Sequence, residues 1–126
     1  MTEAFNPETT YLSLDGAGGV AVHPVDDAFW ANIGQNTAIK DYLVGMYSSA
    51  GPWPHWEVHP QGAEILVLFE GAMSLILREG EAERRVEAKA GEAILVPQGA
   101  LHRAISDGPC RFLAITFGAG TEHVAL

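Results

Sequence analysis

From residue 40 onward, the sequence alternates short apolar runs with turn signals at an even spacing. Glycine or proline turns such as Glu70-Gly71 and Pro97-Gln98-Gly99 separate the runs. Short strands at such spacing, with no helical stretch between them, predict an all-β sandwich or barrel. The runs cover residues 41–49, 53–59, 64–70, 72–78, 83–88, 92–96, 101–106 and 110–117.

Two of these runs predict their own position in a sheet. Residues 64–69 are apolar on both faces, which is typical of a central strand covered on both sides. Residues 81–87 are mostly charged, which favours an exposed or edge strand. Before residue 40 the pattern is mixed. Residues 11–14 and 19–22 have the character of short strands around a loop, whereas 26–33 fits a helical turn or a strand equally well.

The length of 126 residues is enough for one domain with its own hydrophobic core. We therefore expect a single domain over residues 1–126. Its parts are N-terminal strands and loops at 1–39, a barrel core at 40–118 and a C-terminal tail at 119–126.

Charge and composition narrow the classes of partner. The formal net charge of −9 argues against a nucleic-acid or anionic-membrane partner, because both attract basic surfaces. No run approaches the ~20 apolar residues of a membrane span, and the N-terminus lacks the features of a signal peptide. The single Cys110 excludes an internal disulfide and fits a reducing compartment. We expect a cytoplasmic protein.

Side chains that can bind a metal gather on the strand at 53–59 and on two later ones. Because strand side chains alternate, His55, Glu57 and His59 share one face. Glu64 begins the following strand, and His102 begins a later one across a Pro-x-Gly turn. If these groups point into the barrel they need partners, and a divalent cation would satisfy them together. Two imidazoles with one or two carboxylates suit iron, manganese, zinc or nickel.

The spacing of these residues resembles the two motifs of the cupin superfamily. In the first, Gly51, Glu57-x-His59, Glu64 and Gly71 stand in register, with Glu57 where the family has its first histidine. The second has Gly91, Pro97, Gly99 and His102 in register, with Ser106 in place of an asparagine. The segment 56–64 also resembles a subgroup of small single-domain cupins with a Glu-x-His-Pro sequence.

This resemblance implies a jelly-roll barrel of six to eight strands with a metal at its open end. Carried over by position, the ligands are Glu57, His59, Glu64 and His102. Glu57 departs from the family pattern, so ligation and a hydrogen-bonding role beside the metal both stay open for it. His55 is a pocket residue at the barrel mouth or a substitute ligand. A barrel that has lost its metal is the alternative for the whole set.

Two classes of function follow from the resemblance. The first is a metal-dependent enzyme acting on a small organic molecule, with dioxygenase-type chemistry leading and isomerase or lyase chemistry on the same scaffold. Glu57 is then a fourth ligand or the general base. The second is a non-catalytic cupin that binds or senses a small ligand, with or without metal. Trp56 points away from the ligand face and needs a cover, either the N-terminal segment or a second subunit, and the resemblance favours a homodimer.

Overall fold

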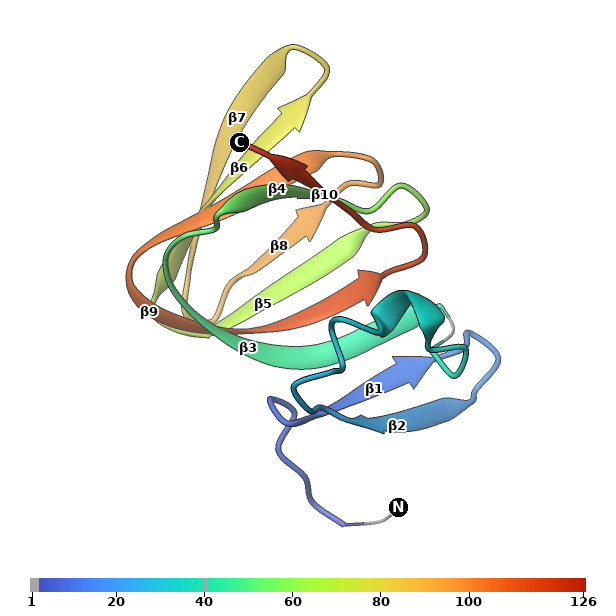
Figure 1. Ribbon diagram of the computed structural model, residues 1–126. Coiled ribbons are helices and arrows are strands. Elements are labelled where there is room, and N and C mark those ends of the chain that lie inside the picture. The colour runs from blue at the N-terminus through green and yellow to red at the C-terminus, as the bar shows by residue number, and fades with distance from the viewer. Residues whose placement is uncertain (1–2, 40) are drawn as a thin grey trace.

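Strands dominate the computed structural model, which describes residues 3–39 and 41–126 (Figure 1). A short 3-10 helix, η1 (Ile33–Gln35), lies between β2 and β3. The all-β jelly-roll barrel expected from the sequence is confirmed. The strands are β1 (Thr10–Leu14), β2 (Val20–Pro24), β3 (Tyr42–Pro52), β4 (His55–Val58), β5 (Glu64–Glu70), β6 (Ala72–Glu79), β7 (Ala82–Lys89), β8 (Ala93–Val96), β9 (Leu101–Phe117) and β10 (Glu122–Ala125).

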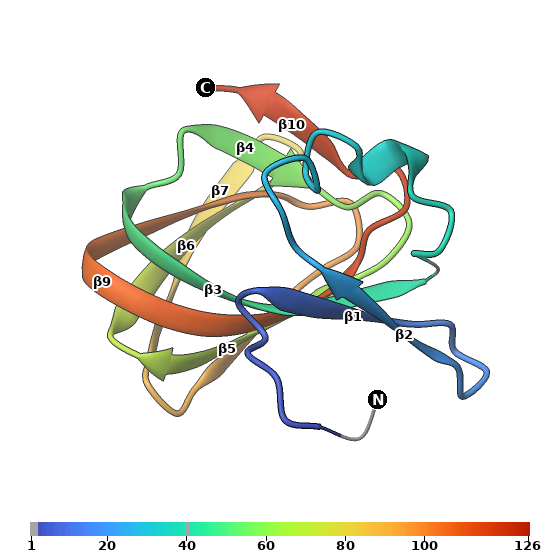
Figure 2. The ribbon, with the colours of Figure 1, turned by 60° about the horizontal axis from the view of Figure 1, so that its bottom comes forward.

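The strands form one sheet that curls into two layers joined by β9. The first half of β9 pairs with β6, with β4 and with the end of β3, and its second half pairs with β3 and β5. The first layer therefore runs β7-β6-β9-β4-β10, and the second runs β8-β5-β9-β3-β1-β2. Figure 2 shows β3 and β9 side by side around the curl. The ten strands found within residues 3–39 and 41–126 exceed the six to eight that the resemblance implied, because β1, β2 and β10 extend the barrel.

The core lies between the two layers. Leu66 and Leu68 of β5 face inward from the second layer, and Leu75 and Leu77 of β6 face inward from the first. Each of these four side chains is at most 1% exposed. They are spaced by two along their strands, as inward-facing positions must be. Leucine pairs from both layers thus close the barrel beneath its open end.

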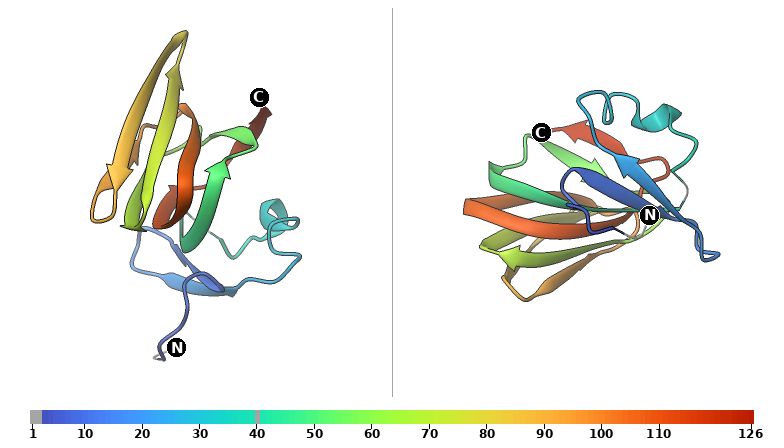
Figure 3. Two further views of the ribbon diagram at one scale, coloured as in Figure 1. Left: turned by 90° about the vertical axis from the view of Figure 1, so that its left-hand side faces the viewer. Right: turned by 90° about the horizontal axis from the view of Figure 1, so that it is seen from below.

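The N-terminal region forms a smaller second core. The side chains of Tyr11 on β1, Leu43 on β3 and Phe29 between β2 and β3 pack together. The rings of Tyr11 and Phe29 meet edge to face, with their centroids 5.4 Å apart. Residues 26–33, for which helical turn and strand were both open, form turns that lead into η1. Figure 3 shows this connection, in cyan, lying to one side of the barrel.

The charged segment at 81–87 and the segment 119–126 each contribute a strand. The charged segment at 81–87 lies in β7, which pairs only with β6, so its edge position is confirmed. The segment 119–126, expected as a tail, contains β10, which pairs with β4 from His55 to Val58. Within residues 3–39 and 41–126, no helix is both long and apolar enough to cross a bilayer.

The turn at Gly71 yields a test of the packing. Gly71 has φ +77°, and a Cβ there would overlap the carbonyl oxygen of Pro109. Gly80 has a similar φ of +64°, with nothing within 4 Å of an added Cβ. We expect Gly80→Ala to lower the free energy of unfolding by about 1 kcal/mol through backbone strain alone. Gly71→Ala should cost about 1–3 kcal/mol more through overpacking, measured by urea denaturation. Equal losses in both variants would contradict the close approach of Pro109.

Candidate metal centre

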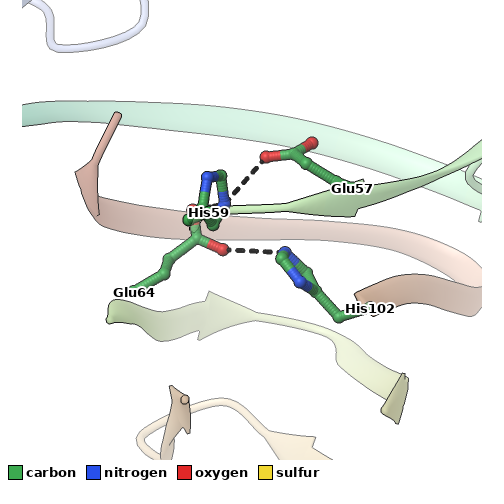
Figure 4. A group of neighbouring side chains, drawn as sticks. All are labelled: Glu57, His59, Glu64 and His102. Carbon is green, nitrogen blue, oxygen red and sulfur yellow. Dashed lines mark ion pairs between the residues drawn. The ribbon is translucent and has the colours of Figure 1, made fainter. Parts of the chain in front are cut away.

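Four predicted ligand residues meet at the open end of the barrel. Glu57 on β4 lies opposite His102 on β9, and His59 follows directly after β4. Glu64 begins β5. Each of the four offers one ligand atom, and these atoms all lie within 4.8 Å of one another. Figure 4 shows the four side chains pointing toward one another.

Burial differs sharply across this group. His59, Glu64 and His102 are at most 4% exposed, whereas the Glu57 side chain is 21% exposed. Three of the groups are therefore removed from water, where an unpaired polar atom is costly. Glu57 lies on the outer side of the cluster, between the buried groups and solvent.

Hydrogen bonds hold both imidazoles in one orientation. Nδ1 of His102 lies 3.0 Å from the carbonyl oxygen of Ala100, which can only accept, so Nδ1 donates. Nδ1 of His59 lies 2.8 Å from the hydroxyl oxygen of Thr121. Both rings therefore direct Nε2 toward the carboxylates. Such outer contacts of a ligating histidine set its tautomer and orientation.

The atoms that face one another in the centre lack ordinary partners. Nε2 of His59, Nε2 of His102 and Oε1 of Glu64 are buried without a hydrogen bond of acceptable geometry. Nε2 of His102 lies 3.3 Å from Oε1 of Glu64. With Nδ1 of His102 protonated, a neutral ring presents a lone pair to a carboxylate oxygen. A cation between these atoms removes the conflict, so the donor set fits a divalent metal.

The carboxylates also shift the protonation of the cluster. Burial lowers the pKa of His59, but Glu57 and Glu64 at 3.0 and 3.4 Å from its Nε2 outweigh it and raise that pKa to about 9. Burial raises the pKa of Glu64, yet the two imidazoles and the hydroxyl of Thr116 together lower it to about 2. Thr116 donates to Oε2 of Glu64 at 2.5 Å. A protonated His59 would therefore place a positive charge between the two carboxylates.

His55, the predicted pocket residue, lies outside this inner group. It is half-buried on β4, and its ring stands 4.5 Å from that of His123. His55, Glu57 and His123 form a second group whose ligand atoms lie within 4.8 Å of one another. Glu57 belongs to both groups.

Sequence reasoning missed three residues of the site. Thr116 is the last inward-facing residue of β9, and a hydroxyl after Phe112 and Ala114 was a signal that could have identified it. Thr121 and His123 lie outside both motifs, and only the pairing of β10 with β4 brings them to the site. No local pattern around residues 119–126 pointed to that pairing.

Trp56 is covered by neither of the two segments that the sequence suggested, the N-terminal segment or a second subunit. Trp56 is 7% exposed without any second subunit. The guanidinium carbons of Arg78 and Arg103 lie 4.7 and 5.9 Å from its ring centroid. Two arginines of the same layer, rather than the N-terminal segment, therefore cover this ring by cation–π contact.

The chain belongs to the cupin domain family, whose model matches residues 45–116. This range contains all four residues of the inner group. Among curated proteins, no sequence matches the chain significantly.

Solved structures with the same fold include both small and large proteins. A cupin-2 domain protein from Shewanella frigidimarina is 22% identical with a TM-score of 0.53, covering 61% of this chain and 71% of its own. Oxalate decarboxylase from Bacillus subtilis is 21% identical with a TM-score of 0.58, covering 73% of this chain and 25% of its own. Hydroquinone 1,2-dioxygenase from Sphingomonas is 16% identical with a TM-score of 0.52, covering 62% of this chain and 60% of its own.

The shifted pKa values predict how the stability of the metal-free protein depends on pH. The stabilisation from His59 is complete below its usual pKa of 6.5 and is lost as pH rises through about 9. The stabilisation from Glu64 is complete above its usual pKa of 4.5 and is lost as pH falls through about 2. Urea denaturation with chelator across pH 6–10 should show the alkaline loss, as a fall roughly two pH units wide. An identical alkaline slope in His59→Asn would contradict this assignment.

Proposed function

We propose that the protein binds a divalent transition metal through His59, Glu64 and His102. The unpartnered Nε2 of His102 facing Oε1 of Glu64 at 3.3 Å is the observation that carries this proposal. Iron, manganese, zinc and nickel all suit a set of two imidazoles and carboxylate. Glu57 completes the set as fourth ligand, with Oε1 3.0 Å from Nε2 of His59. The Glu-x-His-Pro sequence would then be typical of a cupin metal site with glutamate as its fourth ligand.

The glutamate at position 57 changes the charge of the site. Three imidazoles and one carboxylate around a divalent ion carry a net charge of about +1, whereas two of each are formally neutral. The ion is then a weaker electrophile and attracts anionic substrates less. Neutral small organic molecules are therefore the better candidates for this barrel.

Aromatic side chains beside the cluster support binding of a small organic molecule. The ring of Trp53 lies 6.2 Å from that of His102 and 6.5 Å from that of Phe112. Tyr47 stacks on Phe112 at 5.7 Å. Trp53 and Tyr47 are both half-buried, so this aromatic wall remains partly accessible. Such a wall next to a few polar groups is typical of small-ligand sites.

Dioxygenase-type chemistry is the leading activity within this proposal. A metal held by two histidines and a carboxylate keeps positions for substrate and dioxygen when bound. If Glu57 does not bind the metal, it is the candidate general base, because it is the most accessible carboxylate of the inner group. The cupin scaffold also carries decarboxylase and dioxygenase activities in the two enzymes compared above. Isomerase or lyase chemistry fits the same residues.

The alternative is a non-catalytic cupin that binds or senses a small ligand without metal. The contacts of His59 favour it, because a protonated imidazole satisfies both Glu57 at 3.0 Å and Glu64 at 3.4 Å. Oxygen uptake with small aromatic compounds separates the alternatives. Metal-dependent uptake identifies the enzyme, whereas ligand-induced stabilisation without turnover identifies the binder.

The outer face of the second layer supports a homodimer as part of this proposal. One row of apolar side chains crosses six strands on this face, by the pairings of each strand with the next. Ile65 is 39% exposed and Leu95 is 64% exposed. Contiguous apolar patches of this kind mark interaction surfaces. The row consists of Val22, Leu12, Val44, Ile115, Ile65 and Leu95.

We also propose a cellular location and a class of partner for the protein. We place the protein in the cytoplasm as a single cupin domain, which the buried free Cys110 supports. The net charge of −9 supports small molecules over nucleic acid or membranes as partners.

Metal addition tests the proposed function. Protein stripped with chelator should gain roughly 10 °C in melting temperature at ~100-fold excess of manganese, iron, nickel or zinc over Kd. His102→Ala should lose one bound ion per chain and most of this gain, because it removes a buried ligand. Glu83→Ala, an exposed carboxylate on β7, serves as the control and should behave as wild type. Absence of bound metal and of any thermal gain would overturn the metal proposal.

Sedimentation analysis tests the homodimer. The wild-type chain should sediment as a dimer at micromolar concentration, and Leu95→Glu should yield monomers with an unchanged circular dichroism spectrum. A charge placed in the apolar row is desolvated on association, which weakens the dimer by at least tenfold. Val124→Glu on β10 is the matched control, since Val124 is also exposed but lies outside the row. A monomeric wild-type chain would contradict the proposed interface.

A further inference from the structure

A second group of ligand-capable side chains lies at the mouth of the barrel. His55, Glu57 and His123 each offer one ligand atom, and these atoms all lie within 4.8 Å of one another. The two rings are nearly perpendicular at 87°, with centroids 4.5 Å apart. Nε2 of His123 lies 3.5 Å from Oε2 of Glu57. Two imidazoles and a carboxylate at this spacing can reach the ~2.0–2.2 Å bonds of a metal ion after side-chain adjustment.

The backbone holds these three residues in place. β10 pairs antiparallel with β4, so that His123 lies directly opposite Glu57 and Ala125 lies opposite His55. His55 and Glu57 share a face of β4 because they are two residues apart. His123 projects to that same face from the neighbouring strand. The ligand group is therefore built on paired strands, which position side chains better than a loop does.

Glu57 connects this outer group to the inner centre. Its Oε1 lies 3.0 Å from Nε2 of His59, and its Oε2 lies 3.5 Å from Nε2 of His123. Each oxygen of one carboxylate thus faces a different cluster. A neutral imidazole at position 57 would offer a lone pair to one side and an N–H donor to the other. A glutamate instead supplies an anionic oxygen to both sides.

We propose that His55, Glu57 and His123 form a second divalent transition-metal site, with Glu57 bridging it to the inner metal. His123 is 55% exposed, so water or a ligand reaches the remaining positions of this outer ion. Carboxylate-bridged ions in two-metal sites lie about 3.5–4 Å apart. The bridge rests on the proposed inner metal, whereas the outer site stands on its own three residues.

Metal stoichiometry tests this proposal with Zn²⁺ as the probe. Untagged protein is stripped with chelator and dialysed against Zn²⁺, and bound metal is measured by mass spectrometry. The wild-type chain should hold two ions. The double variant His55→Ala/His123→Ala should hold one, and so should His102→Ala. Glu122→Ala is the matched control, because Glu122 is an exposed carboxylate on the same strand β10, and it should keep two ions.

The variants distinguish failure of the outer site from failure of the inner one. One ion that survives the double variant but is lost in His102→Ala would overturn the outer site and leave the inner metal intact. One ion with the opposite behaviour would establish the outer site and overturn the inner metal and its bridge. No bound ion would overturn both sites. Circular dichroism establishes that each variant is folded, and His102→Gln replaces His102→Ala if the latter is not.

Electron paramagnetic resonance with Mn²⁺ tests the bridge separately. Two ions sharing the Glu57 carboxylate should give a spin-coupled spectrum in the wild-type chain. The double variant should give the spectrum of an isolated ion, and Glu122→Ala should keep the coupled one. Two bound ions without coupling would overturn the bridging role of Glu57.

Discussion

Charge compensation among His59, Glu64 and His102 is the constraint on which this structure depends. These groups are at most 4% exposed inside a leucine-lined barrel, where an isolated charge is strongly unfavourable. Their neighbours are arranged to relieve that cost. Hydrogen bonds at Nδ1 of each histidine orient the rings, and Thr116 donates to Glu64. The atoms left without a hydrogen-bond partner are Nε2 of both histidines and Oε1 of Glu64. The space between them suits a cation or a proton.

Glu57 links this buried centre to the solvent. Its carboxylate raises the pKa of His59, and in the proposed site it would neutralise a bound ion. Metal and proton therefore compete for one position, since a ligating imidazole must be deprotonated. The family's usual histidine would give a more electrophilic ion. In the proposed metal site, residue 57 would thus set both the occupancy and the reactivity of the centre.

Much of the fold followed from local sequence, because turn residues and the two-residue period of strands act over short distances. The register of the two motifs also brought Glu57, His59, Glu64 and His102 together as expected. The features that local sequence did not predict depend on pairing between distant segments. Thr121 and His123 reach the site only through β10 on β4. The cover of Trp56 depends on the alignment of β6 and β9, which no single run of residues reveals.

The long strand β9 has a consequence for how the molecule opens. It spans 17 residues and belongs to both layers, pairing with β6 and β4 in one and with β3 and β5 in the other. Neither layer can detach without breaking hydrogen bonds to a strand that the other layer holds. We therefore expect the two layers to unfold together. The pairings of β9 also join residues far apart in the sequence, Tyr42 with Phe117 among them, so we expect the barrel to fold slowly.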